Sequence, residues 1–141
     1  MIALDTNLLI YAHRAGTPKH RGARAAIERA ASDATGWGIA LPCLSEFWCI
    51  VTHPACEGGP SRAKDALAFL DALMAGGAKI WYPGFDFGPR FMELAKALNV
   101  SGVRVFDLQI AAVAFENGAK EIWTHDREFV ALPGLRVHDP L

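Results

Sequence analysis

Short apolar runs alternate with longer segments of helical periodicity along the whole chain. The short runs have the length and β-type composition of buried strands, and they lie at residues 2–4, 36–41, 79–82, 121–124 and 135–137. The longer segments repeat apolar residues every three to four positions, as amphipathic helices do. They predict helices at residues 8–12, 17–32, 44–53, 61–75, 89–98 and 107–117.

Helix-capping residues stand at several of these boundaries. Asp5, Thr6 and Asn7 follow the first apolar run directly and have the side chains of a helix N-cap. Ser61 is predicted to cap the helix that follows the Gly-Gly-Pro loop, and Gly118 to close the helix at 107–117. The chain therefore passes from strand to helix at well-marked points.

Strands that alternate with helical crossovers imply a mainly parallel sheet with helices on both faces. We predict a three-layer α/β fold with a central sheet of four to five strands. The sequence contains no internal repeat and no interdomain linker. Residues 1–141 are therefore expected to form a single domain.

Composition narrows the class of protein. Hydrophobic residues make up 52% and the net charge is −1, so the chain is globular and any nucleic-acid contact must depend on a local basic patch. No run approaches the roughly 18 apolar residues that span a membrane. The three cysteines form no CxxC pair, which argues against a disulfide framework and favours a reducing compartment. We expect a cytoplasmic protein.

Four acidic residues follow strands or lie near helix starts. Asp5 comes directly after the first strand, and Asp126 comes shortly after the fourth. Glu46 lies in the first turns of the helix after the second strand, and Asp107 begins the helix at 107–117. Taken singly, each could be a helix cap or a solvated surface acid. Together they are predicted to meet, because ligands of parallel sheets bind beyond the carboxyl ends of the strands.

Carboxylates that lie close together repel one another, and a hard divalent cation offsets that repulsion. An acidic cluster that holds Mg²⁺ or Mn²⁺ is the usual apparatus for phosphodiester hydrolysis. No GxxxxGK[ST] loop, GxSxG elbow or HExxH helix is present to favour another mechanism.

Three segments carry a resemblance to a known family, and they are MIALDTNLLIYA, LPCLSEFWCIVTHP and VFDLQIAAVAFENGAKEIWTHDREF. With their order and separations, the chain resembles the PIN-domain family, specifically VapC-type toxins of toxin–antitoxin pairs. The resemblance implies a parallel sheet with a central first strand and a Mg²⁺- or Mn²⁺-dependent endoribonuclease. It also implies a cognate antitoxin that neutralises the enzyme, and often a homodimer.

Family roles carry over residue by residue. Catalytic and metal-binding roles fall on Asp5, Glu46, Asp107 and Asp126, while Asn7 and Thr124 would be polar supports that orient the ligands. Two positions depart from the family pattern. Glu128 stands where members often have a second Asp after the fourth acid, and Leu108 stands where they often have Ala.

The only concentrated basic region runs from His13 to Arg29. Its residues Arg14, Arg21 and Arg24 are predicted to contact RNA phosphates, with an ordinary solvated helix face as the alternative. The four tryptophans fall in strands or on apolar helix faces and are expected in the core, and they are Trp37, Trp48, Trp81 and Trp123.

An antitoxin is expected to occupy the acidic cleft with a basic residue and to dock on an apolar wall nearby. That wall is predicted from residues 47–51 and from the helix that contains Leu67, Leu70 and Leu73. Two other functions stay open. One is a PIN-fold nuclease that processes RNA without an antitoxin, and the other is a catalytically inactive PIN module that binds RNA or protein.

Overall fold

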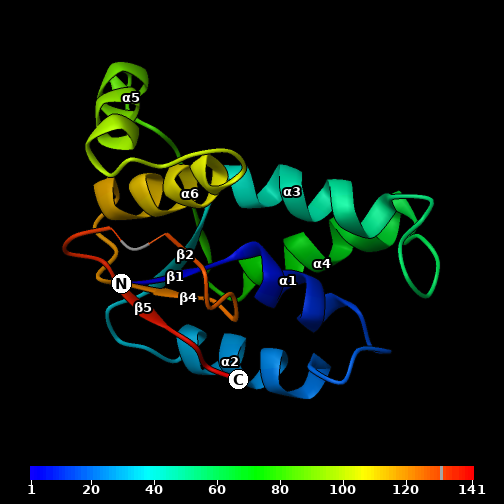
Figure 1. The fold of residues 1–141 in the computed structure, drawn as a ribbon. Helices are drawn as coiled ribbons and strands as arrows, with labels where there is room; N and C mark the ends of the chain where they lie inside the picture. The colour runs from blue at the N-terminus through cyan, green and yellow to red at the C-terminus, as the bar shows by residue number, and fades with distance from the viewer. Residues whose placement is uncertain (131) are drawn as a thin grey trace.

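A computed structural model describes residues 1–130 and 132–141 and has five parallel strands in one sheet over these residues (Figure 1). The sheet order is β3-β2-β1-β4-β5. The strands are β1 (Ile2–Leu4), β2 (Trp37–Ala40), β3 (Lys79–Trp81), β4 (Glu121–Trp123) and β5 (Arg136–His138). The prediction of a mainly parallel sheet with a central first strand is confirmed.

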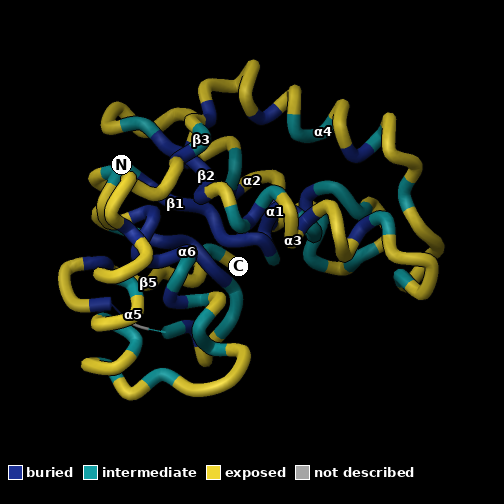
Figure 2. The backbone as a smooth tube through the Cα atoms, turned by 90° about the horizontal axis from the view of Figure 1, so that it is seen from above, coloured by how far each residue is buried: buried dark blue, intermediate teal, exposed yellow. Residues whose placement is uncertain are grey.

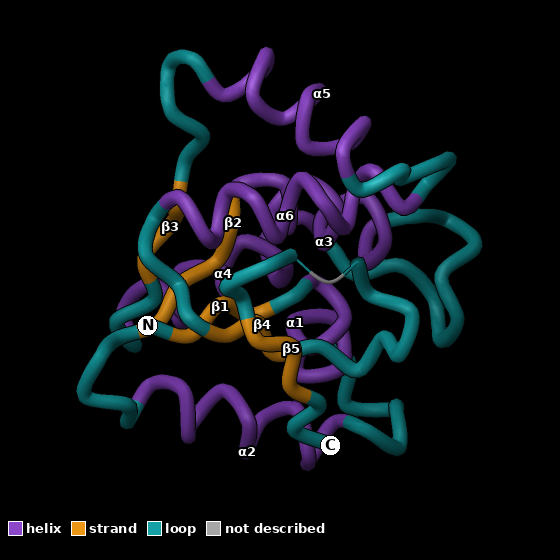
Figure 3. The backbone as a smooth tube through the Cα atoms, turned by 60° about the vertical axis from the view of Figure 1, so that its left-hand side comes forward, coloured by secondary structure: helices purple, strands orange, loops and turns teal. Residues whose placement is uncertain are grey.

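Helices connect the strands and cover both faces of the sheet. They are α1 (Thr6–His13), α2 (His20–Ala31), α3 (Leu41–Thr52), α4 (Ala63–Ala75), α5 (Phe87–Ala97) and α6 (Arg104–Glu116). Figures 1 and 3 show α2 on one side of the sheet and α6 on the other, which makes the predicted three layers. None of the helices in the described part of the chain is long and apolar enough to cross a membrane.

The central strands are buried along their whole length. Every residue of β1 and β2 is buried, as a strand covered on both faces requires. In Figure 2 the buried colour runs through the middle of the molecule, while α4 carries a mostly exposed outer surface. The helix α6 crosses the core with residues 110–114 all buried. A rigid frame therefore lies beneath the carboxyl ends of β1 and β4.

The predicted helix starts all lie two or three residues from the observed ones. The helix α6 begins at Arg104 rather than Asp107, so Asp107 lies in its first turn instead of at its cap. The helix α5 begins at Phe87, two residues before Pro89. Ser61 does not cap α4, whose N-cap is Arg62, because the Ser61 hydroxyl hydrogen-bonds to Nε2 of His13 at 2.9 Å. Gly118 does follow α6 with φ +90°, as a C-terminal glycine should.

Three of the four tryptophans are buried as expected. Trp37, Trp81 and Trp123 have at most 8% of their surface exposed. Trp48 is the exception, since 38% of it is exposed on α3. Leu108 is completely buried, so the departure from Ala at this position enlarges the core beside Asp107 and leaves no new group on the surface.

Candidate active site

The four predicted acids approach the place where the strand order reverses. From β1 the chain crosses to β2 and β3 on one side, and it returns to β4 on the other side of β1. Asp5 follows β1, and Asp126 follows β4, its direct neighbour in the sheet. Crevices for ligands open at such a point in parallel sheets, because the two crossovers leave in opposite directions.

Asp5 is fixed at the junction of β1 and α1. Its carboxylate caps α1 by accepting a hydrogen bond from the backbone N–H of Thr6 at 2.7 Å. The second oxygen accepts from the Thr124 hydroxyl at 2.6 Å and from the amide of Asn7 at 2.9 Å. Only 6% of Asp5 is exposed, so this carboxylate has little freedom to move.

The electrostatics of Asp5 follow from its burial. Burial raises the pKa of the Asp5 carboxyl from 3.8 to about 6, because the charged form loses its hydration. Hydrogen bonds from Thr124 and Thr6 oppose this rise, while the negative charges of Glu46 and Asp107 add to it. Three of the predicted acids are therefore close enough to influence one another.

Glu46 joins the site through Thr6. The Thr6 hydroxyl donates a short hydrogen bond to Oε2 of Glu46, which lies on α3. The backbone N–H of the same threonine binds Asp5, so Thr6 connects the two carboxylates. Glu46 itself is an exposed residue, although its hydrogen bond with Thr6 is partly buried.

Asp107 and Asp126 meet around Arg104. Nη1 of Arg104 lies 2.9 Å from Oδ2 of Asp107 and 3.0 Å from Oδ2 of Asp126. Nη2 pairs with Oε2 of Glu128. A hydrogen bond from the backbone N–H of Glu128 and the guanidinium of Arg104 together lower the pKa of the Asp126 carboxyl. Asp107 and Asp126 are thus already paired with a cation.

Asn7 and Thr124 connect the two sides, as polar supports would. The Asn7 amide donates to Thr124 Oγ1 at 2.8 Å, and its oxygen accepts from the backbone N–H of His125 at 3.2 Å. Thr124 Oγ1 also accepts from the backbone N–H of Asp126 at 3.0 Å. One hydroxyl therefore touches both Asp5 and the peptide of Asp126.

The donor chemistry fits a hard divalent cation. Mg²⁺ and Mn²⁺ prefer carboxylate oxygens. Burial raises the pKa of Asp5 and the charges of Glu46 and Asp107 add to that rise, while Asp107 already binds a guanidinium. However, within residues 1–130 and 132–141 no group of three His, Cys, Asp or Glu side chains is arranged as a ready metal site. The acids are shared instead between the hydroxyls of Thr6 and Thr124 and the guanidinium of Arg104.

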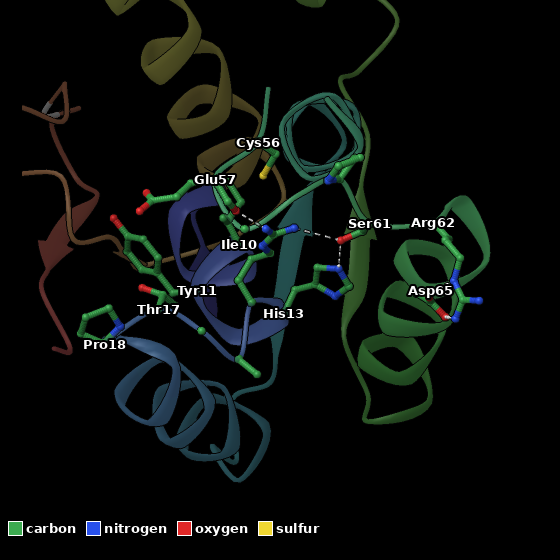
Figure 4. A pocket seen from close by; sticks show the side chains of 15 residues that line it. Ile10, Tyr11, His13, Thr17, Pro18, Cys56, Glu57, Ser61, Arg62 and Asp65 are labelled. Atoms are coloured by element: carbon green, nitrogen blue, oxygen red, sulfur yellow. Dashed lines mark hydrogen bonds and ion pairs between the residues drawn. The ribbon is translucent and has the colours of Figure 1, made fainter. Parts of the chain in front are cut away.

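The predicted RNA-contacting arginines lie apart from these acids. Arg14 follows the far end of α1, roughly 13 Å from Asp5 by the helical rise. It lines a pocket of about 810 Å³, where its guanidinium donates to Ser61 and to the carbonyl of Glu57 (Figure 4). Arg21 and Arg24 are exposed on α2. Their contact with RNA stays a prediction.

Comparison with known proteins decides the family. The PIN domain family model matches residues 2–135. Ribonuclease VapC43 of Mycobacterium tuberculosis is 34% identical over 142 residues, which cover 100% of this chain and 96% of that protein. Ribonuclease VapC33 of the same organism is 31% identical over 148 residues, covering 100% and 99%. The chain is a VapC-type member of the PIN domain family.

Solved structures agree with this fold. The crystal structure of VapC20 from Mycobacterium tuberculosis, described as a Sarcin-Ricin loop cleaving toxin, has a TM-score of 0.71 at 17% identity. That match covers 99% of this chain and 100% of VapC20. VapBC2 from Rickettsia felis has a TM-score of 0.67 at 21% identity, with 98% of each chain covered.

Two residues of this PIN-domain site were underestimated from the sequence. Arg104 was not among the predicted site residues, although its spacing of three from Asp107 places both on one helix face. Thr6 was considered only for helix capping, although it lies between Asp5 and Asn7. In both cases the signal was proximity to a predicted acid.

Proposed function

We propose that this chain is a Mg²⁺- or Mn²⁺-dependent endoribonuclease that acts as the toxin of a toxin–antitoxin pair. The observation that carries the proposal is the buried Asp5 carboxylate, held at the reversal point of the sheet and influenced by the charges of Glu46 and Asp107. Kinship with VapC ribonucleases over the whole chain supports RNA as the substrate. Residues 1–141 would form a single domain.

The four acids Asp5, Glu46, Asp107 and Asp126 would hold the metal. A bound divalent ion would lower the pKa of an attacking water and neutralise charge on the phosphate. Thr124 and Asn7 orient Oδ2 of Asp5 through their hydrogen bonds, while the Thr6 backbone N–H holds Oδ1. Thr6 does the same for Glu46. Attack by water would leave a 5′-phosphate and a 3′-hydroxyl.

An antitoxin would neutralise the enzyme by docking on α3 and α4 and covering the acidic site. Several apolar side chains of α3 and α4 stay exposed, and they are Trp48, Ile50, Leu67 and Met74. They support docking of an amphipathic segment on these helices. Of the predicted wall, Phe47, Val51 and Leu73 are buried in the core and are not available to a partner. We also propose that the chain forms a homodimer. We further propose a cytoplasmic location, because the three cysteines are free, as in a reducing compartment.

Cleavage of RNA in the presence and absence of metal tests the enzymatic part. Purified protein is incubated with total RNA in Mg²⁺ or Mn²⁺, with and without EDTA, and the ends of the products are mapped. We expect cleavage that EDTA abolishes and that added metal restores. Intact RNA under every metal condition would favour an inactive binding module, while cleavage that EDTA leaves unchanged would refute the role of metal.

Co-expression tests the partner. The product of the neighbouring reading frame is co-purified with this chain, and RNA cleavage by the complex is compared with that by the free protein. We expect a stable complex with reduced cleavage. A neighbouring product that does not bind, or that binds without reducing cleavage, would favour an RNA-processing nuclease that has no antitoxin.

A further inference from the structure

Arg104 places a positive charge among the acids on which the proposed metal site depends. It is the first residue of α6, and Asp107 follows one turn later on the same face. Asp126 and Glu128 come from the loop after β4. One guanidinium thus ties carboxylates from two separate segments together.

The guanidinium uses the same oxygens that a metal would need. Its Nη1 lies 2.9 Å from Oδ2 of Asp107 and 3.0 Å from Oδ2 of Asp126. Oxygen ligands of Mg²⁺ or Mn²⁺ lie at roughly 2.0–2.2 Å, so an ion that bound both atoms would lie where the guanidinium now reaches. Two cations that close together also repel each other strongly.

The pairing leaves the cluster negatively charged. Arg104 supplies one positive charge, whereas Asp107, Asp126 and Glu128 supply three negative charges. A divalent cation neutralises these acids more completely than the guanidinium does. The arginine side chain is flexible and 34% exposed, so it can turn toward solvent without disturbing the core.

We infer that Arg104 is a positioning residue that holds Asp107 and Asp126 together in the metal-free protein and is displaced when a divalent cation binds. This inference rests on the proposed function, because it assumes that these acids bind metal. Arg104 then sets the metal affinity of the site, since each ion must compete with its guanidinium. The site would load only above a threshold of free metal that this arginine determines.

Substitution of Arg104 separates this role from a purely structural one. If the arginine served only to support the acids, Arg104→Gln would disorder them and weaken metal binding. If the arginine competes with metal, the same substitution strengthens metal binding. Arg104→Lys keeps the charge but replaces the planar guanidinium, which can pair with two carboxylates at once, by a compact ammonium group. It should give an intermediate affinity for metal.

Arg127→Gln is the matched control. It removes an equal charge from the residue next to Asp126, and Arg127 makes no ion pair with any residue that the structure describes. A general effect of net charge would appear equally in both variants. A competition specific to the guanidinium would appear only in the Arg104 variants.

Calorimetric titration of Mn²⁺ into metal-stripped protein at fixed ionic strength gives the affinities. We expect Arg104→Gln to bind Mn²⁺ roughly tenfold more tightly than the unmodified chain, a size typical of coupling between two binding events. The Arg127→Gln affinity should stay within about twofold of the unmodified value. In parallel, the Arg104 Nε–Hε NMR signal, identified by its loss in Arg104→Gln, should shift as Mg²⁺ saturates the unmodified protein.

Equal or weaker Mn²⁺ binding by a folded Arg104→Gln variant would overturn the inference and leave the proposed metal site intact. An Arg104 signal that does not shift at saturating Mg²⁺ would also overturn the inference. That measurement is made on the unmodified protein, and the Arg104→Gln variant is needed only to assign the signal. If neither protein bound Mn²⁺ or Mg²⁺, the proposed metal site would fall and the inference with it.

Discussion

The two sides of the acidic site manage negative charge in opposite ways. Asp5 is buried, and its partners are the neutral groups of Thr6, Asn7 and Thr124. Asp126 has 38% of its side chain exposed and is paired with the guanidinium of Arg104. Burial raises the pKa of Asp5 to about 6, while the backbone N–H of Glu128 and the guanidinium of Arg104 lower that of Asp126.

The difference indicates which side would gain more from a bound cation. Hydrogen bonds from neutral donors do not fully compensate a buried carboxylate, so the Asp5 side gains from either a proton or a metal ion. The side that contains Asp107 and Asp126 already has a cation of its own. A metal ion bound between the two sides would offset the cost of burying the Asp5 charge. It would also replace the Arg104 guanidinium as the partner of Asp107 and Asp126.

The largest effect is expected when an acid on either side loses its charge. Asp5→Asn and Asp107→Asn keep similar shapes but remove a ligand charge, and each should lower RNA cleavage at least about a hundredfold. Asp71→Asn, on the exposed surface of α4, is the control and should cleave normally. Initial rates on one labelled RNA provide the measurement. Normal rates in both site variants would show that the acids are not catalytic.

The next effect is on stability against pH in EDTA. The Asp5 carboxyl has a pKa of about 6 in the folded chain against 3.8 as reference, so the folded state binds the extra proton between these values. Its contribution is fully present below pH 3.8 and is lost as the pH rises through about 6.

The size of that loss is at most roughly 3 kcal/mol, from about 1.4 kcal/mol for each unit of pKa. Asp5→Asn does not titrate, so the difference in unfolding free energy between the two proteins isolates this contribution. Urea unfolding from pH 4 to pH 8 should show the unmodified chain losing stability relative to the variant. A difference that stays constant with pH would contradict the burial of a costly charge at Asp5.

A smaller loss should follow from breaking the connection between the two sides. Thr124→Val keeps the shape but removes the hydroxyl that binds Asp5, Asn7 and the peptide of Asp126. We expect a loss of about 1–3 kcal/mol in unfolding free energy, since buried partners stay unpaired. Thr124→Ser keeps the hydroxyl and should lose less. If Ser were as damaging as Val, the methyl group rather than the hydroxyl would be the important part.

The smallest effect is expected at Glu128. Its side chain is 80% exposed, and ion pairs in such positions contribute little. Glu128→Gln should change the unfolding free energy by less than about 0.5 kcal/mol and cleavage by less than about threefold. A loss of cleavage as large as that in Asp107→Asn would make Glu128 a full member of the acidic set.

Much of the arrangement of strands and helices could be predicted from the sequence, because capping residues and apolar runs mark the same boundaries. The apolar run at residues 2–4 and the cap at Asp5 both mark the end of β1, and the structure has that junction. The start of α6 was misplaced because Val103 caps it without a side-chain hydrogen bond, so no residue type marks the boundary. The fifth strand was predicted one residue early, at 135–137 rather than 136–138.

The detailed arrangement of the site depended on tertiary contacts. That Asp5 would be buried, with a raised pKa, follows from the packing of α1 against its neighbours and not from its own type. That Arg104 would meet Asp126 required knowing that the loop after β4 lies beside the start of α6. The sequence could suggest that these acids lie at one edge of the sheet, but it could not identify the groups that pair with each of them.

A crystal grown with Mn²⁺ would show whether the two sides share one metal ion, because the anomalous signal of manganese locates the ion. We expect a peak within about 2.5 Å of carboxylate oxygens from both Asp5 and the pair Asp107 and Asp126, with the Arg104 guanidinium moved away. A protein that cleaves RNA in Mn²⁺ and yet shows manganese only elsewhere, with Arg104 still bound to both acids, would contradict this expectation.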